Sequence, residues 1–213
     1  MKAIPKRTLF VTCVVILLPM FFGLALWNRL PERMPTHFDF SGTANGYSSR
    51  PFAVIGIPLF ILAMHLFCAV MLRADPKKQN ISEKMAQLVL WVCPAASLFA
   101  GLSVYLSALG FAINVSRFGM VFVGLIFIAI GNYLPKCRHN YTVGIRVPWT
   151  LDDEDNWNHT HRFAGYVWII AGVVTLLSVF LGHATVVWVA AIFVASLSPL
   201  VYSFIYAKRH GKI

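Results

Sequence analysis

Six long stretches without a charged residue limit what this chain can fold into. The runs without Asp, Glu, Lys or Arg contain six apolar segments of 20, 21, 26, 17, 19 and 24 residues, the last two separated by Gly182-His183. These segments are Thr8–Trp27, Phe52–Leu72, Leu88–Ile113, Phe118–Leu134, Phe163–Leu181 and Ala184–Ala207. About 20 apolar residues in a helix cross the hydrocarbon layer of a bilayer, in which each segment must satisfy its own backbone hydrogen bonds. We therefore expect an all-α integral membrane protein with six transmembrane helices.

The composition and the placement of charge agree with this expectation. Hydrophobic residues make up 58% of the chain and charged residues 12%, which leaves too little polar surface for a water-soluble globule. Of the 18 Lys and Arg residues, 14 fall in loops on the side of both termini and 4 on the other side. Because basic residues near span ends resist translocation, both termini are predicted to be cytoplasmic. The net charge of +10 then reflects insertion and contact with the lipid bilayer, and no direct nucleic-acid partner is expected.

The first span also fits a second interpretation. A basic start followed by an apolar run describes a signal peptide, and Gly23-Leu-Ala25 is a small-x-small pattern of the kind that is cleaved. The run is long for a signal peptide, and its removal would break the alternation of basic and non-basic loops. We therefore expect this segment to be the first span.

Two connections are long enough to have structure of their own. The outer loop covers residues 28–51, between the first two spans, and the inner loop covers residues 135–162, between the fourth and fifth. The predicted domains are residues 1–113, three spans with the outer loop, and residues 114–213, three spans with the inner loop. Any function outside the helix bundle must lie in one of these loops.

The outer loop is predicted to form a compact, hairpin-like extracytoplasmic cap. Pro31 and Pro35 exclude a regular helix, and the alternating segment Thr36–Phe40 followed by Asn45-Gly46 is typical of a strand and a tight turn. The candidate residues for contact at this outer face are Pro35, His37, Phe38, Phe40 and Gly42.

The inner loop is predicted to lead into a helix that continues as the fifth span. Pro148 pushes Val147 toward an extended conformation, and Thr150 with Asp153 three residues later has the pattern of a capping box. The acidic run Asp152–Asp155 then lies at the positive N-terminus of that helix, where its dipole favours negative charge. An aromatic and histidine stripe follows at helical spacing, formed by Trp157, His161, Ala164 and Trp168.

A second stripe on this helix is polar and contains Asp155, His159 and Arg162. It could be a ligand-binding face or a solvated, internally paired one. His159 and His161 point about 200° apart on a helix, so we do not expect them to hold a metal together. The sequence contains no G-x-S-x-G, H-E-x-x-H, P-loop or G-x-G-x-x-G pattern, so no cofactor is expected and the chain is not predicted to be an enzyme.

One ionisable side chain, His65, lies deep within a predicted span. Ionisable groups inside a membrane are candidates for a proton or substrate pathway. The structural alternative is a neutral, hydrogen-bonded histidine.

The inner loop carries an ordered set of matches to one protein family. The matching segments are Gly131–Lys136, Asn140, Gly144–Leu151, Trp157–Arg162 and Gly165, and the pattern resembles the signature of the SdpI family of bacterial immunity proteins. The outer segment Pro31–His37, with Gly42 and Gly46, is similar to the domain of unknown function often found at the start of these proteins. Together with the six spans, the resemblance covers nearly the whole chain.

The resemblance implies a multi-pass protein of the bacterial cytoplasmic membrane that protects its cell from a secreted toxic peptide. In the best-known system the protein also draws a cytoplasmic transcriptional repressor to the membrane when toxin is bound. The sequence departs from the family pattern at Val147, where Thr is usual, at His159, and in the acidic run Asp152–Asp155. The residues assigned to ligand or partner binding in the inner loop are Asn132, Pro135, Lys136, Asn140, Gly144, Arg146, Pro148, Trp149, Thr150, Trp157, Thr160, His161, Arg162 and Gly165.

A structural interpretation of the same loop stands beside the functional one. Its polar residues could cap and tie the cytoplasmic ends of the fourth and fifth spans, with two tryptophans anchoring them at the interface; these residues are Asn132, Asn140, Arg146, Thr160, Trp149 and Trp157.

Two other functional classes stay open, a small membrane transporter and a membrane-embedded enzyme. A polar cavity at His65 would favour transport, and a carboxylate with a histidine in hydrogen-bond reach at a cleft would favour an enzyme.

Overall fold

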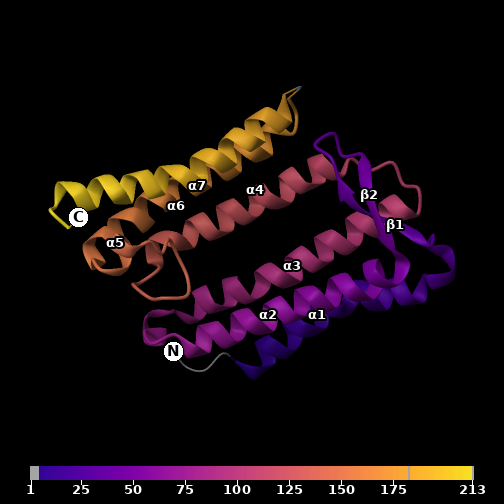
Figure 1. The fold of residues 1–213 in the computed structure, drawn as a ribbon, viewed down its shortest axis with the longest axis horizontal. Helices are drawn as coiled ribbons and strands as arrows, with labels where there is room; N and C mark the ends of the chain where they lie inside the picture. The colour runs from indigo at the N-terminus through magenta and orange to yellow at the C-terminus, as the bar shows by residue number, and fades with distance from the viewer. Residues whose placement is uncertain (1–4, 182, 213) are drawn as a thin grey trace. The chain divides into compact units, whose positions relative to one another are not determined.

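A computed structural model describes residues 5–181 and 183–212 of the chain (Figure 1). Helices dominate it, and the one pair of strands among the described residues lies between the first two long helices. The helices are α1 Lys6–Ala25, α2 Ile57–Ala74, α3 Glu83–Ala108, α4 Val115–Tyr133, α5 Pro148–Leu151, α6 Glu154–Ser178 and α7 Ala184–Arg209, and the strands are β1 Arg33–Phe38 and β2 Ala44–Ser49.

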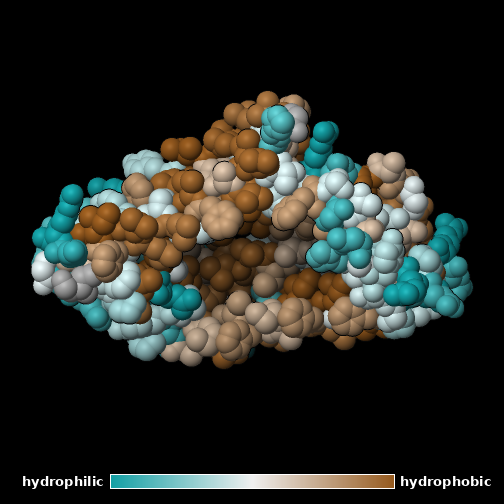
Figure 2. All heavy atoms as spheres, turned by 45° about the horizontal axis from the view of Figure 1, so that its top comes forward, coloured by the Kyte–Doolittle hydropathy of each residue, from teal (hydrophilic) through white to brown (hydrophobic). Residues whose placement is uncertain are grey.

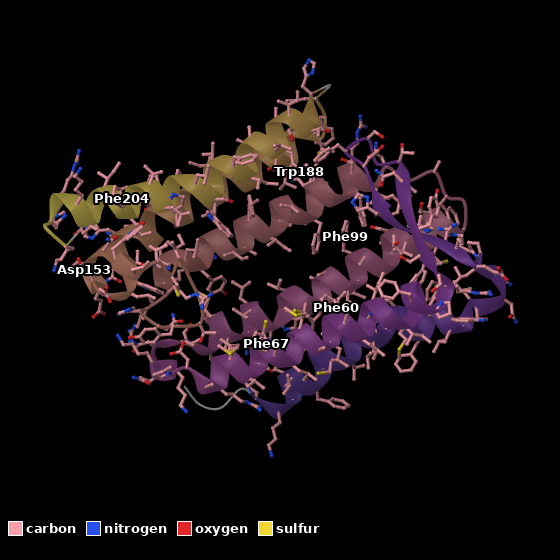
Figure 3. All side chains as sticks on the ribbon, viewed as in Figure 1. Phe60, Phe67, Phe99, Asp153, Trp188 and Phe204 are labelled. Atoms are coloured by element: carbon pink, nitrogen blue, oxygen red, sulfur yellow. The ribbon has the colours of Figure 1, made fainter. Side chains whose placement is uncertain are left out.

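The expected number of membrane spans is confirmed. Within the described part of the chain, six helices are long and apolar enough to cross a bilayer: α1, α2 with the π-helical turn Phe52–Gly56 before it, α3, α4 extended to Lys136, α6 and α7. Large apolar side chains such as Phe60, Phe67 and Phe204 are exposed along these helices (Figure 3). On the face drawn in Figure 2, apolar side chains cover the middle of the helices and hydrophilic ones gather at their ends. Such a surface requires lipid rather than water around it.

The chain forms two compact units. The first, which we call the hairpin unit, comprises the described residues up to Val70 together with Gln87–Gly119. The second, which we call the loop unit, comprises Met71–Ala86 together with the described residues from Met120 onward. The division of the sequence at residues 113 and 114 stays a prediction.

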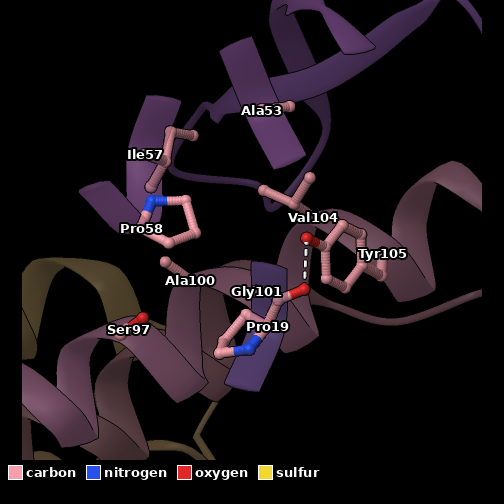
Figure 4. A pocket seen from close by; sticks show the side chains of 9 residues that line it. All are labelled: Pro19, Ala53, Ile57, Pro58, Ser97, Ala100, Gly101, Val104 and Tyr105. Carbon is pink, nitrogen blue, oxygen red and sulfur yellow. Dashed lines mark hydrogen bonds between the residues drawn. The ribbon is translucent and has the colours of Figure 1, made fainter. Parts of the chain in front are cut away.

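In the hairpin unit, α1 and α3 approach each other closely because glycines lie where they meet. A methyl group on Gly101 would come within 2.5 Å of Pro19, and one on Gly23 would meet the hydroxyl of Tyr105. The Tyr105 hydroxyl donates to the carbonyl of Pro19 (2.8 Å), as Figure 4 shows. The cavity beside this contact measures about 10 Å³, the space of at most one water molecule. The helices are therefore joined by tight packing.

In the loop unit, glycines again mark the contact between helices, here between α4 and α6. A methyl group on Gly165 would lie 2.9 Å from the carbonyl oxygen of Gly131, and one on Gly172 would lie 2.6 Å from that of Gly124. Both helices place their glycines seven residues apart, which keeps them on one face. The backbones of α4 and α6 therefore touch at two levels.

A tryptophan on α6 supplies a hydrogen-bond donor that α7 lacks. Pro199 lies inside α7 and has no N–H, so the carbonyl of Ala195 loses its usual helical donor. The indole Nε1–H of Trp168 donates to that carbonyl at 2.9 Å. A carbonyl without a donor would be costly in lipid, and here a side chain of the neighbouring helix supplies the donor.

The outer loop forms the expected hairpin, but its turn is not where the sequence placed it. Asn45 and Gly46 lie inside β2, where Gly46 pairs with His37. The turn is instead the segment Asp39–Thr43, closed by Gly42 with φ +87. The Asp39 carboxylate accepts hydrogen bonds from the Ser41 hydroxyl (2.6 Å) and from the backbone N–H groups of Ser41 and Thr43. The bond from the Ser41 hydroxyl, followed by that from the Thr43 N–H, lowers the pKa of Asp39.

Candidate functional site

The inner loop, residues 135–162 (the motif loop below), is a folded element of the loop unit. It begins with the 3-10 turn Leu134–Lys136, contains the short helix α5, and ends in the first turns of α6. The predicted capping box is wrong, because Asp153 rather than Thr150 caps α6, accepting from the N–H of Asp155 at 3.1 Å. Figure 3 places Asp153 at the start of α6, where Lys212 pairs with it (3.9 Å).

Asn140 closes the first turn of the motif loop. Its side-chain oxygen accepts from the N–H groups of Thr142 (2.9 Å) and Val143 (2.7 Å), and its amide donates to the carbonyls of Arg138 (2.8 Å) and Val143 (3.0 Å). Asn140 is buried, so a full set of partners is needed to offset its desolvation. Its role is to fold the turn.

Cys137 lies at the base of the same turn and is buried. Its thiol donates to the carbonyl of Val143 (3.4 Å), and its carbonyl accepts from the indole of Trp157 (2.7 Å). Burial raises the pKa of Cys137 to about 11, against a smaller opposing effect of the hydrogen bond from Asn140. The thiol is therefore protonated and covered in the folded loop.

His161 ties the middle of the motif loop to α6. The N–H of Ile145 donates to its Nε2 (2.9 Å), so Nδ1 carries the proton and donates to the carbonyl of Trp157 (2.8 Å). The imidazole stacks on the Trp157 ring at 4.0 Å between centroids. A methyl group on Gly144, which has φ +120, would clash with His161 Nε2, so this position requires glycine. All of these contacts fix the loop against the helix.

The second half of the motif loop is tied to α7 through one serine. The indole of Trp149 donates to the hydroxyl of Ser203 (2.9 Å), and the amide of Asn156 donates to its carbonyl (3.0 Å). Thr160 in turn donates to the Asn156 side chain at 2.9 Å. Thr150 ties α5 to the segment before it by donating to the carbonyl of Ile145 (2.8 Å).

The loop between α2 and α3 also holds the motif loop, a contribution that the sequence did not reveal. Asp75 is 4% exposed, and its carboxylate accepts from the N–H of Tyr141 (2.9 Å) and the hydroxyl of Thr142 (2.5 Å). Asn80 donates to the carbonyl of His139 (2.7 Å), and the ammonium of Lys77 donates to the ring nitrogen Nδ1 of His139 (3.1 Å). No local pattern in the sequence points to these partners.

The exposed charged side chains of the motif loop are basic in its first part, up to Arg146, and acidic around the start of α6, where Asp152, Glu154 and Asp155 are exposed. Lys136, Arg138 and Arg146 are all exposed, and Tyr141 lies among them in sequence, also exposed. Arg146 donates through one guanidinium nitrogen to the carbonyl of Tyr141 at 2.7 Å. The remaining donors of Arg146 form no other hydrogen bond among the described residues. This surface is suited to carboxylate or phosphate groups.

The predicted site residues therefore divide into two sets. Those that are buried, and whose contacts shape the loop, are Asn140, Thr150, Trp157, Thr160, His161 and Gly165, together with Gly144 at its tight approach to His161. Those that are exposed are Asn132, Pro135, Lys136, Arg146, Pro148 and Arg162, and Trp149 is half-buried. Trp157 has no exposed surface, so the idea that it anchors the loop at the membrane interface is wrong.

The outer candidates divide in the same way. Pro35 is buried within β1, and Gly42 lies against Asn114 and Ser116 at the start of α4. His37 is exposed and hydrogen-bonded through Nδ1 to the Asn45 side chain (2.5 Å), while Phe38 is half-buried. His37 and the exposed Phe40 are thus the outer candidates that a partner could reach.

His65 on α2 has no exposed surface, and a hydrogen bond of 2.9 Å joins its Nε2 and the hydroxyl of Thr12 on α1. Its Nδ1 has no hydrogen-bond partner in the part of the chain that the structure describes. The pair joins two helices, and in this conformation nothing from solvent reaches the ring.

His159 and His161 lie on opposite sides of α6, as their spacing predicted, since His161 is buried and His159 is exposed. The described residues contain no group of three or more His, Cys, Asp or Glu side chains placed to hold a metal ion.

Comparison with known proteins agrees with the pattern found in the motif loop. The family model described as "SdpI/YfhL protein family" matches residues 136–203, and the one described as "Domain of unknown function (DUF1648)" matches residues 14–62. "Immunity protein SdpI" of Bacillus subtilis (strain 168) is 24% identical over 205 residues, which cover 93% of this chain and 95% of that protein. The chain is thus similar to the SdpI/YfhL family over residues 136–203, and to one immunity protein over nearly its whole length. No solved structure matches the chain.

Six membrane-capable helices among the described residues, together with the similarity to SdpI proteins, identify the chain as a multi-pass protein of the bacterial cytoplasmic membrane. The relative that aligns over 93% of the chain is named an immunity protein, which agrees with the expectation that the chain is not an enzyme. The family match covers the motif loop, and the second match covers the outer hairpin, so both soluble elements lie within the resemblance.

Proposed function

We propose that this protein gives its cell resistance to a secreted toxic peptide. The observation that carries this proposal is the alignment with an immunity protein over 93% of the chain, which includes the outer hairpin and the motif loop together. The toxin meets the protein at the outer hairpin, where His37 and Phe40 are exposed beside the membrane. The proposal needs no catalytic group, because binding and sequestration are enough to protect a cell.

The motif loop is the second half of the proposal. Toxin binding changes how the loop presents its exposed basic residues, and Lys136, Arg138 and Arg146 dock an acidic cytoplasmic partner such as a transcriptional repressor. Such coupling requires the toxin to bind one of two states of the protein more tightly than the other. The exposed position of Arg146, which forms a single hydrogen bond among the described residues, supports a role in contact with a partner rather than in folding.

The test is a challenge of sensitive bacteria that express the protein with candidate secreted peptides. We expect survival with the wild type, and loss of at least tenfold in survival with Arg146→Ala at unchanged protein abundance. Arg209→Ala is the matched control, since Arg209 is an exposed arginine at the end of α7, outside the motif loop. Equal killing with and without the wild-type protein, across the candidate toxins, would contradict the proposal.

Replacement of His161 separates folding from function in the same assay. His161 is buried with both ring nitrogens bonded, so we expect His161→Ala to reduce the amount of protein in the membrane. Abundant His161→Ala protein without protection would instead give the ring a direct role in contact.

A further inference from the structure

Asp75 is a buried carboxylate that no part of the proposed function yet uses. It lies just after α2, and its three hydrogen-bond donors are neutral: the N–H of Lys77 (2.7 Å), the N–H of Tyr141 and the hydroxyl of Thr142. A buried charge is costly unless its partners are placed well. Two of the three donors come from the motif loop, so the Asp75 carboxylate and the Tyr141–Thr142 turn stabilise each other.

Tyr141 connects Asp75 to Arg146. Tyr141 donates its N–H to Asp75 and accepts at its carbonyl from the guanidinium of Arg146 (2.7 Å). Whatever fixes the backbone of Tyr141 therefore fixes the position of Arg146. Thr142 strengthens the hold, because its hydroxyl and its neighbour's N–H both reach the same carboxylate oxygen of Asp75.

We propose that Asp75 is a positioning residue of the motif loop, which holds the Tyr141–Thr142 turn and thereby sets where Arg146 is presented. Asn80 and Lys77 extend the same contact by binding His139. The loop between α2 and α3 and the motif loop are thus one cytoplasmic recognition element. The inference rests on the proposed function only for its consequence in cells, because the positioning itself can be measured on purified protein.

A native cysteine reports on this contact. Cys137 is 5% exposed at the base of the turn that Asp75 holds, and its raised pKa keeps the thiol protonated, so it reacts slowly while the turn is closed. Replacement of Cys13, Cys68 and Cys93 by Ser leaves Cys137 as the one thiol, since the chain has four cysteines. The rate at which N-ethylmaleimide labels the purified protein then measures how often the turn opens.

The decisive variant is Asp75→Asn, which keeps the shape of the side chain. Both carboxylate oxygens of Asp75 accept hydrogen bonds, and in the variant an amide NH₂, which cannot accept, replaces one of them. We expect its Cys137 to be labelled at least tenfold faster than in the wild type. Thr142→Val removes one donor and should give a smaller increase, and Thr142→Ser, which keeps the hydroxyl, should restore the wild-type rate. Labelling of Asp75→Asn at the wild-type rate would overturn the inference.

Asp39→Asn is the matched control. The Asp39 carboxylate also accepts two backbone N–H groups and a hydroxyl, but in the outer hairpin of the other unit. It should leave Cys137 labelling unchanged; an equal acceleration would mean general destabilisation and would overturn the inference. If Asp75→Asn loses its folded state, the pair Thr142→Val and Thr142→Ser decides, and equal rates in that pair would also overturn the inference.

The challenge assay separates this inference from the proposed function. If both hold, Asp75→Asn lowers survival as Arg146→Ala does, and the double variant is no worse than Arg146→Ala alone. If the wild type gives no protection, the proposed function fails while the labelling rates still decide the role of Asp75.

Discussion

At the scale of single residues, the motif loop is defined by polar side chains that are buried and fully bonded. Asn140, Thr150 and His161 have almost no exposed surface, and each binds backbone groups of the loop itself. A loop without regular structure leaves many N–H and C=O groups without partners, and these side chains supply them. Their replacement should therefore act on the fold first, and on contact with a partner only as a consequence.

The titration of Cys137 gives a prediction at this scale. The thiol keeps its proton to about pH 11 in the folded loop and loses it near 9.0 when unfolded, so the folded state binds more protons between these values. Its contribution, roughly 2–3 kcal/mol, is fully present below pH 9 and is lost as the pH rises toward 11. Unfolding free energies of the purified protein should fall more steeply over this range in the wild type than in Cys137→Ala. Equal slopes would contradict the assignment.

At the scale of helices, small residues and prolines decide how the spans meet. Glycines on α4 and α6 bring the backbones into contact, and the break at Pro199 in α7 is closed by Trp168 of α6. In lipid there is no hydrophobic force between helices, so close packing and hydrogen bonds between helices hold them together. The glycine packing and the Trp168 hydrogen bond can each be tested by substitution.

Gly165→Ala should destabilise the loop unit strongly. The added methyl group would come within 2.5 Å of Pro135 and 2.9 Å of the Gly131 carbonyl, and neither is the end of a flexible side chain. We expect a loss of about 1–3 kcal/mol in thermal or denaturant unfolding in detergent. Gly119→Ala on α4 is the control, because its methyl group would lie 3.7 Å from Phe99, an ordinary contact. Similar losses in the two variants would argue against the close approach of α4 and α6.

Trp168→Phe should destabilise the protein by about 1 kcal/mol, because the carbonyl of Ala195 loses its donor. In a Pro199→Ala background the chain itself supplies an N–H to that carbonyl, so the cost of losing the Trp168 indole should be smaller. A double-mutant cycle measures the difference, for which we expect about 0.5–1 kcal/mol. Additive effects would mean that the indole contributes by packing alone.

At the scale of the whole molecule, the placement of charge is the feature that relates the protein to its membrane. The motif loop, the loop between α2 and α3 and both termini carry 14 of the 18 basic residues, and the hairpin side carries 4. From this asymmetry, the positive-inside rule predicts that the motif loop lies in the cytoplasm and the hairpin outside. The proposed function depends on this sidedness, because toxin and partner must act from opposite faces.

Paired reporter cysteines test the sidedness directly. In a cysteine-free background, Ser41→Cys in the hairpin and Arg138→Cys in the motif loop are both at exposed positions. A thiol reagent that does not cross membranes should label Ser41→Cys in intact cells and Arg138→Cys only after permeabilisation. Labelling of Arg138→Cys in intact cells would reverse the orientation and remove the basis for a cytoplasmic partner.

The sequence by itself determined the features that depend on neighbouring residues in the chain. Uncharged runs of sufficient length determined six spans, and helical spacing from Trp157 to Trp168 predicted the continuous helix α6. Prolines predicted an extended outer loop, although the turn was placed at Asn45-Gly46 instead of Asp39–Thr43, because an Asp that accepts from three donors competes with a local turn pattern.

Only the tertiary structure decided which residues of the motif loop are buried and what holds it. Asp75 meets Tyr141 across 66 residues of sequence, and Ser203 meets Asn156 across 47, so no local periodicity could reveal either contact. The same is true of Trp157, which a hydropathy argument places at the membrane interface and which has no exposed surface in the structure. Hydropathy and spacing describe one helix at a time, whereas the partner of a buried polar group is set by how separate segments meet.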